Sequence, residues 1–444
     1  MKRIGTAKHI FLFFFSLLPL KGGCFLAAQQ TNVIHITLEE AQERAVQQSV
    51  SLQKNALDLE SAAYSASNLW SEFFPSLSAG AGISYGSNLF SNGGFTLEEN
   101  NFSYSLSAGV SLSLNAGLPL SMRIITLAYQ SQLLTYEDTK RQIGIQITKA
   151  FYNLLAEKQN ITLLEEKLDL AQKQREKSAV AFRNGLISER SDMQAQFAME
   201  NARLDVNKAS IQYESHLRDF LTLLGMDVSA DHVALDGAIE SEKTSFDAES
   251  LIRDILPKRP DIVRQRQTIE RLELAKRQKI LSSKAPSVSA SIQWKGGTGS
   301  AALQGRFSDS ITGSLSVAIP IDPWIPGTKS DQTLRTAETD IEKARLDLVS
   351  IENTAKNEIK NLCANLWNLW RTIEIARMQV NIAERAYQLT EQAFQQGAVE
   401  VLTLEDARNA LTAARQQLLS AELAYKLGIL DLEAAVNVDL MSGV

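Results

Sequence analysis

The positions of proline restrict the fold of this 444-residue chain more than any other feature. Proline is absent from Ser121 to Leu256 and again after Pro326. Because proline interrupts the interior of a helix, long helices can form in these two gaps. A helix from Ser121 to Phe182 would extend for about 93 Å, which is typical of a coiled-coil-like rod. Its apolar residues recur every three, four or seven positions, the spacing of one helix face: Ile147, Phe151, Leu154, Ile161, Leu164, Leu168 and Ala171.

Each predicted rod ends at a glycine, Gly185 or Gly397, and glycine favours the last turn of a helix. A shorter helix then returns, as far as about Leu224 or Val436. Thr403 followed by Asp406 has the spacing of a capping box at the start of the second return helix.

The chain repeats one plan. Pro75–Ala79 (PSLSA) matches Pro286–Ala290 (PSVSA), and "FRNG" ending at Gly185 matches "FQQG" ending at Gly397, with offsets of 211 and 212 residues. A nearly constant offset indicates a duplicated unit. We therefore expect one repeat at 37–224, a connector at 225–250 and a second repeat at 251–440.

Each repeat also contains two segments in which apolar and small polar residues alternate. The alternation predicts strands at about 76–86 and 102–114, and at about 287–295 and 310–319. One interpretation is a soluble antiparallel sheet; the other is a transmembrane β-barrel, favoured by the export signal and the flanking rods. A sheet edge cannot remain unpaired in lipid, and four strands cannot close around water. The barrel therefore requires several chains, and three would supply twelve strands.

The N-terminal segment has the pattern of a signal peptide, expected at 1–28, with a basic start, an apolar core and small residues near Ala28. Cys24 in "LKGGC" is a candidate lipidation site, although Lys21 stands where that motif prefers an aliphatic residue. Ordinary cleavage near Ala28 is the alternative. Either way the mature chain keeps at most one free thiol and forms no internal disulfide. The net charge of -6 makes nucleic acid an unsuitable partner.

With these features, three motifs resemble those of TolC-like outer-membrane efflux proteins: "KRPDI" at 258–262, "PSVSA" at 286–290 and "GAVEVLTLEDA" at 397–407. The resemblance extends from about Thr37 to Leu440. It implies a mainly helical fold with transmembrane strands, in which a homotrimer forms a twelve-stranded barrel in outer-membrane lipid. A helical periplasmic tunnel would continue the barrel. It also implies docking to a periplasmic adaptor (a membrane fusion protein) and to an inner-membrane pump of the RND or ABC type, with no cofactor.

The resemblance also supplies candidate site residues. In the family, acidic side chains surround the closed tunnel entrance. Asp406 falls on one such position, Thr403 occupies another that is usually aspartate, and Glu400 or Glu405 could replace its charge. Asp406 can equally be read as a helix-capping carboxylate. The two turns are candidate adaptor contacts: Arg183, Asn184, Gly185, Leu186, Ile187 and Ser188, and Gln395, Gln396, Gly397, Ala398 and Val399. In the first turn, Asp192 comes one position later than in the family pattern.

Other functions fit the sequence less well. Its four histidines are scattered, and it has no metal-binding, phosphate-binding or nucleophile-elbow motif, so we expect no enzymatic activity. A purely structural envelope coiled coil would explain the helices but not the strands. Within the channel interpretation, a drug or metal efflux conduit and a type I protein-secretion conduit both remain open.

Overall fold

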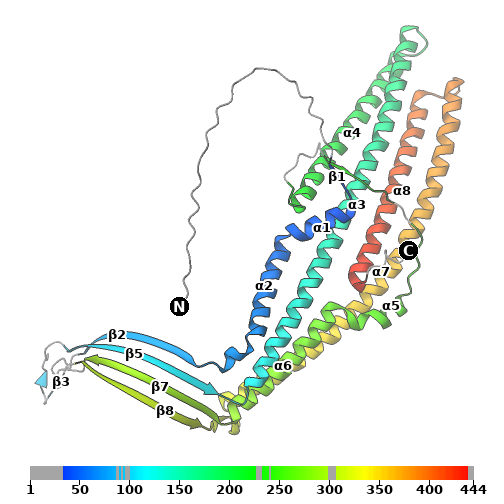
Figure 1. Cartoon of the computed structure of the whole chain (residues 1–444). Helices are drawn as coiled ribbons and strands as arrows, with labels where there is room; N and C mark the ends of the chain where they lie inside the picture. Colours follow the sequence, from blue (N-terminus) through cyan, green and yellow to red (C-terminus); the bar gives the residue numbers. More distant parts are fainter. Residues whose placement is uncertain are drawn as a thin grey trace, which may run out of the picture.

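The computed structural model describes residues 34–86, 90–91, 94–95, 101–226, 233–239, 242–298 and 307–438. The predicted signal peptide and Cys24 lie outside these residues. The described chain has two parts, a long bundle of helices and a sheet that projects from one end of it (Figure 1). None of the described helices is both long and apolar enough to span a membrane.

Two very long helices dominate the bundle, α3 (Leu118–Arg183, 66 residues) and α7 (Lys329–Gln395, 67 residues). As predicted, α7 lies in the second proline-free region and α3 in the first, apart from the first turn of α3, which contains Pro119. α4 (Glu189–Leu223) and α8 (Val401–Val436) return antiparallel to them. The remaining helices are shorter: α1 (Leu38–Gln48), α2 (Val50–Ser67), α5 (Ala248–Ile255), α6 (Pro260–Lys284) and the 3-10 helices η1 (Leu69–Phe73), η3 (Leu256–Lys258) and η5 (Asp322–Trp324).

The projecting sheet has four antiparallel strands in the order β2-β5-β7-β8. Their bounds are close to those expected from the alternation: β2 (Ser76–Gly86), β5 (Asn101–Leu114), β7 (Ser287–Thr298) and β8 (Phe307–Ala318). The two hairpins of the sequence therefore lie side by side in one sheet. Strands β2 and β8 form its two edges, and each has an unpaired side within the described chain.

Two small pairings were not foreseen from the sequence. β1 (Ile34–Ile36) pairs in parallel with β6 (Val233–Leu235), which lies in the segment expected to be a featureless connector. β3 (Phe90–Ser91) pairs with β4 (Gly94–Phe95) beyond the end of β2.

Each helical hairpin has its own apolar core, and corresponding residues occupy both. Ile147, Leu154 and Phe220 are buried between α3 and α4, and the residues 212 positions later, Ile359, Leu366 and Leu432, are buried between α7 and α8. Tyr425 is 1% exposed, and its hydroxyl accepts a hydrogen bond from the backbone N–H of Thr244 at 3.1 Å. The same spacing of apolar side chains therefore builds both cores.

The helices lie in a row rather than in a compact bundle. α3 contacts α2 and α4 on one side and α6 and α8 on the other, and α7 packs on α6 and α8. In Figure 1, α2 and α4 follow one another along α3. The chain therefore has two lateral flanks. The first flank consists of β2, α2 and α4, and the second flank consists of β8 and α7.

Candidate functional site

One face of the four-stranded sheet is almost entirely small and polar. The register pairs Ser78 with Gly109, Gly109 with Gln293, and Gln293 with Thr312, which places all four on the same face. The residues of this face whose side chains the structure describes are Ser76, Ser78, Gly80, Gly82, Ser84, Ser103, Ser105, Ser107, Gly109, Ser111, Ser113, Ser287, Ser289, Ser291, Gln293, Lys295, Gly297, Ser308, Ser310, Thr312, Ser314, Ser316 and Ala318.

Hydroxyl groups on this polar face bond across the strands. The Oγ atoms of Ser289 and Ser316 are 2.7 Å apart, and those of Ser291 and Ser314 are 2.8 Å apart. Gly82 lies directly opposite Ser105, and a Cβ at position 82 would come within 2.9 Å of the Ser105 Oγ. The alternation of serine and glycine thus lets the paired strands approach with their hydroxyls satisfied.

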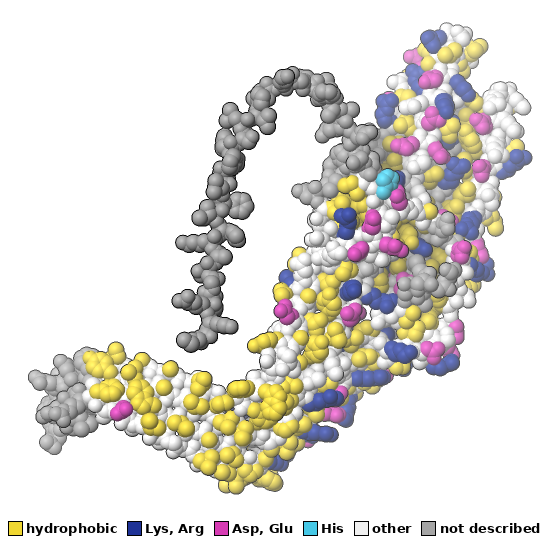
Figure 2. Space-filling model, viewed as in Figure 1, with side chains coloured by type: hydrophobic (Ala, Val, Ile, Leu, Met, Phe, Trp, Pro, Cys, Tyr) yellow, Lys and Arg dark blue, Asp and Glu magenta, His cyan; other side chains and the backbone are white. Residues whose placement is uncertain are grey.

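The opposite face is apolar and exposed in the single chain. Its described side chains include Leu77, Ile311 and Leu315, which are 81%, 74% and 75% exposed. Figure 2 shows hydrophobic side chains gathered over the sheet, whereas the acidic and basic side chains lie mainly over the helices. A continuous apolar patch of this extent marks a membrane or protein interaction surface.

The far end of the bundle consists of two similar turns, shown at the top of Figure 1. Gly185 and Gly397 have φ values of 69° and 74°, the left-handed conformation that glycine adopts at helix ends. In each turn the glycine N–H bonds back three residues and the next N–H bonds back five, to Ala181 or Ala393. Most residues of the two turns are exposed, with Ile187 and Val399 half-buried.

The first turn is held by two polar interactions. The Ser188 hydroxyl caps α4 by accepting from the N–H of Ser191 at 3.3 Å. The Arg175 guanidinium bonds to the Asp192 carboxylate at 2.8 Å, and both side chains are largely buried. Asp192, which lies one position later than in the family pattern, therefore joins α4 to α3 through Arg175.

The second turn differs from the prediction at its helix start. Glu400 is the N-cap of α8 and makes no side-chain capping bond, and Thr403 already lies inside the helix. The predicted capping box of Thr403 and Asp406 is therefore wrong, because α8 begins at Val401, before either residue. Asp406, Thr403 and Glu400 are all exposed.

Glu405 is the exception among the candidate gate residues, because its carboxylate turns into the bundle. It accepts a hydrogen bond from Arg408 at 2.7 Å, and the two side chains are only 13% and 6% exposed. Burial raises the pKa of Glu405, although Arg408 and Lys167 oppose that rise. Glu405 is thus a buried partner of Arg408 rather than a free acidic group at the turn.

Both flanks carry exposed apolar stripes. On α4 the stripe consists of Met193, Phe197, Leu204 and Ile211, with exposed fractions of 61%, 70%, 49% and 66%. At about 100° per residue, it lies opposite the face where α4 packs on α3 through Ala195 and Ala202.

The second flank has a matching stripe on α7: Ile375, Met378, Ile382 and Leu389, with exposed fractions of 57%, 62%, 64% and 51%. The two stripes lie at similar distances from the turns at the far end of the bundle. Met193 follows Gly185 by eight residues and Leu389 precedes Gly397 by eight, while Leu204 and Met378 are each nineteen residues from the same glycines. On the first flank, Val50, Leu57 and Tyr64 extend the apolar surface along α2.

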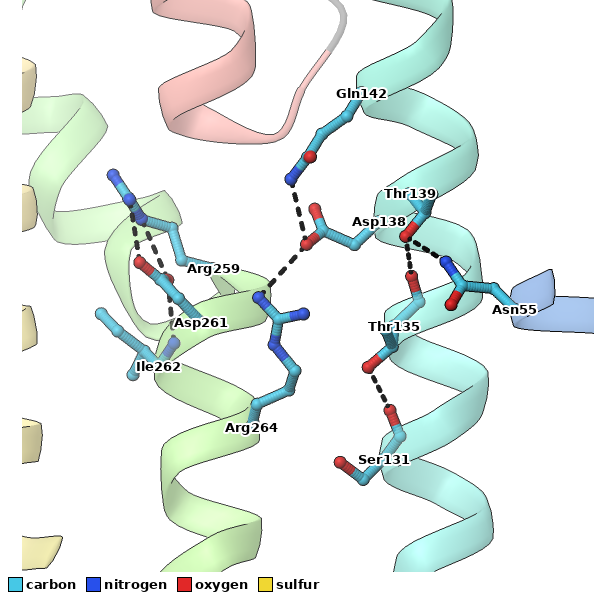
Figure 3. Close-up of polar contacts among 10 residues, drawn as sticks. All are labelled: Asn55, Ser131, Thr135, Asp138, Thr139, Gln142, Arg259, Asp261, Ile262 and Arg264. Atoms are coloured by element: carbon cyan, nitrogen blue, oxygen red, sulfur yellow. Dashed lines mark hydrogen bonds and ion pairs between the residues drawn. The ribbon is translucent and has the colours of Figure 1, made fainter. Parts of the chain in front are cut away.

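The "KRPDI" motif has a structural role where α6 begins, as Figure 3 shows. Arg259 forms two hydrogen bonds with Asp261, at 3.1 and 2.9 Å, and one with Glu358 of α7 at 2.9 Å. Arg264 forms an ion pair of 3.2 Å with Asp138 of α3 (Figure 3). The motif therefore connects the start of α6 to α7, and Arg264, two residues beyond the motif, connects α6 to α3.

The flank stripes cannot be recognised as surfaces from the sequence alone. Their residues recur every three, four or seven positions, as do those of the cores, so the pattern shows that a face is apolar but not which neighbour covers it. The exposure of the side chains in the folded chain distinguishes them from the core.

The sequence matches the family model described as outer membrane efflux protein over residues 41–226 and 251–438. No curated protein compared with the chain is significantly similar in sequence. Among solved structures, it resembles the CmeC outer-membrane channel of Campylobacter jejuni (TM-score 0.71, 16% identity, covering 90% of this chain and 85% of CmeC). It also resembles the MtrE outer-membrane channel of Neisseria gonorrhoeae (0.68, 20%, 90% and 88%) and the outer-membrane protein VceC of Vibrio cholerae (0.66, 18%, 90% and 95%).

Proposed function

The chain belongs to the outer membrane efflux protein family, and from this we propose that three copies form the outer-membrane exit duct of a tripartite export system. Members of this family are outer-membrane channels and not enzymes, and the protein is accordingly an outer-membrane efflux channel with a long helical periplasmic part. The number of copies, the barrel, the division into repeats at 37–224 and 251–440, the gate and the partners are parts of the proposal.

The observation that carries the proposal is the complementarity of the two flanks. The unpaired edge of β2 lies on the first flank and that of β8 on the second, and both flanks continue down the helices as apolar stripes. A contact between the first flank of one copy and the second flank of the next uses two different surfaces. Repeated head-to-tail contacts of this kind generate a closed ring when the rotation from one copy to the next closes on itself.

Closure of the ring would pair both edges of the sheet and place each of its faces in a suitable environment. Edge strands cannot remain unpaired in lipid, because each unsatisfied backbone group there costs several kcal/mol. Three copies provide twelve strands, an even number typical of outer-membrane barrels. The apolar face then meets lipid and the polar face lines water, the arrangement of a transmembrane barrel around a lumen.

The turns at the far end would form the periplasmic entrance of this duct. Three-fold symmetry would bring three copies of Asp406 towards the axis, where their exposed carboxylates would attract cations. The exposed residues around Gly185 and Gly397 are the proposed contacts for the periplasmic adaptor, through which an inner-membrane pump of the RND or ABC type would deliver its substrate. The substrates are expected to be small molecules such as drugs or metals, or secreted proteins.

Two measurements test the assembly. Light scattering of the purified protein in detergent should give the mass of three chains, and a monodisperse single chain with intact strand content would refute the proposal. Planar-bilayer recordings should show a cation-preferring conductance, with the preference reduced in Asp406→Ala and further reduced in Asp406→Arg. If both variants fold and conduct as the parent does, Asp406 is not part of the gate.

A further inference from the structure

A lysine interrupts an otherwise uncharged surface on the polar face of the sheet. Among the residues of that face whose side chains the structure describes, every residue except Lys295 is serine, glycine, threonine, glutamine or alanine. Lys295 lies on β7, paired with Ser107 of β5 and with Ser310 of β8. Its side chain is exposed. The ammonium group therefore projects from a surface of hydroxyls and glycines.

Asp309, the described acidic residue closest to Lys295 in the strand register, does not neutralise the charge of the lysine. Asp309 pairs with Gly296, so strand alternation places it on the apolar face, away from Lys295. Its carboxylate accepts from the Trp294 Nε1 at 3.4 Å, on that same face. Within the described part of the chain, Lys295 forms no ion pair.

Lys295 lies far from the helices. It follows Ser287, the first residue of β7, by eight positions, which is about 26 Å along a strand at about 3.3 Å per residue. Twelve strands spaced about 4.8 Å apart and tilted by about 40° close into a barrel with a backbone radius of about 12 Å. Since a lysine side chain reaches inward from the wall, three ammonium groups would lie within about one Debye length of the axis at 0.1 M salt.

We propose that Lys295 sets the charge preference at the outer end of the channel, where three copies favour anionic over cationic solutes. This inference rests on the proposed trimeric channel. A ring of like charges within low-dielectric walls concentrates ions of the opposite sign. The preference is opposite in sign to that expected from Asp406, so the two ends of the duct would differ. Anionic substrates would meet attraction rather than repulsion at the exit.

A local probe tests the charge independently of the periplasmic entrance. Ser107 is the register partner of Lys295, so Ser107→Cys places a reporter thiol beside it on the same face. Cys363 is replaced by serine, and Cys24 is removed or blocked under either processing route expected from the sequence. The measurement is the ratio of reaction rates of the reporter with an anionic and a cationic thiosulfonate, applied to the assembled protein in vesicles.

Replacing Lys295 by glutamine should lower the anionic-to-cationic rate ratio by roughly five-fold in 10 mM salt, where the Debye length is about 30 Å. The effect should disappear in 1 M salt, where the Debye length is about 3 Å. An unchanged ratio in Lys295→Gln at low salt would overturn the inference.

Three controls make the result specific. Lys284→Gln removes the same charge from the last residue of α6, three residues before β7, where the Lys284 Nζ lies 5.1 Å from the Trp324 ring centre, and should not alter the ratio. A reporter at Ser113, about 20 Å away along β5, should respond much less. Moving the charge along the same face, with Gln293→Lys and Lys295→Gln together, should restore the ratio.

The outcomes separate the two proposals. A Ser107→Cys thiol that reacts equally well in the parent and in Lys295→Gln supports the lumen and refutes the lysine's role. A thiol that reacts with neither reagent means that the polar face does not line water, which refutes both the proposed channel and the inference.

Discussion

Replacing Phe197 by alanine should dissociate the proposed trimer while leaving each chain folded. Phe197 is 70% exposed in the single chain, so it contributes little to the packing of α4 on α3. Burying a phenylalanine side chain is worth about 1.5–3 kcal/mol, and the contact recurs three times in a closed ring. The variant therefore loses about 6 kcal/mol per trimer. At about 1.4 kcal/mol per factor of ten, its association constant should fall by about four orders of magnitude.

Light scattering or sedimentation across a dilution series in detergent measures this change, with circular dichroism to verify that the helices persist. Gln196→Ala is the matched control, because Gln196 is the exposed neighbour of Phe197 on α4 and lies outside the stripe. Ile382→Ala on the second flank should weaken assembly to a similar degree. If Phe197→Ala and Ile382→Ala dissociate no more readily than the parent, the flanks do not meet and the reasoning fails.

Four further substitutions test the fold and the two turns. Gly82→Ala brings a Cβ to within 2.9 Å of the Ser105 Oγ and should lower the unfolding temperature. Adding Ser105→Ala removes that oxygen and should restore the unfolding temperature. A double variant as unstable as Gly82→Ala alone would refute this steric explanation. Gly185→Ala should lower the free energy of unfolding by about 1 kcal/mol, because φ is positive at this position. Gly144→Ala should raise it by about 0.5–1 kcal/mol, because Gly144 lies inside α3 and a Cβ there would meet open space. Denaturant unfolding measures both changes. Burial raises the pKa of Glu405 in the folded chain above its ordinary carboxyl value. The free energy of unfolding therefore falls as the pH rises from the ordinary value through the raised pKa, and this loss is absent below the ordinary value. Glu405→Gln leaves the Arg408 guanidinium buried without its charged partner and should unfold at a lower temperature than the parent. The parent's advantage should shrink as the pH rises from about 4 to 7, because only the parent loses stability over that range, and an advantage that grows with pH would contradict the assignment.

The sequence alone determined the long helices, their turns and the four strands of the projecting sheet, because the causes of these elements are local. The absence of proline permits α3 and α7, glycine ends them, and residues three or four positions apart share a helix face. Strand alternation likewise assigned Ser107 and Leu106 to opposite faces, since successive side chains on a strand always diverge. These properties depend on near neighbours in the chain.

The tertiary structure decided which surfaces are covered and which remain open. The stripe of Phe197 and the core around Phe220 have the same periodicity, and only the packing of α4 on α3 separates them. In the same way, Glu405 and Asp406 are adjacent acidic residues, yet Glu405 turns inward to Arg408 while Asp406 remains exposed. Pairings between distant segments, such as β1 with β6 and Lys295 with Ser107, depend on how whole elements dock, and no local pattern encodes that geometry.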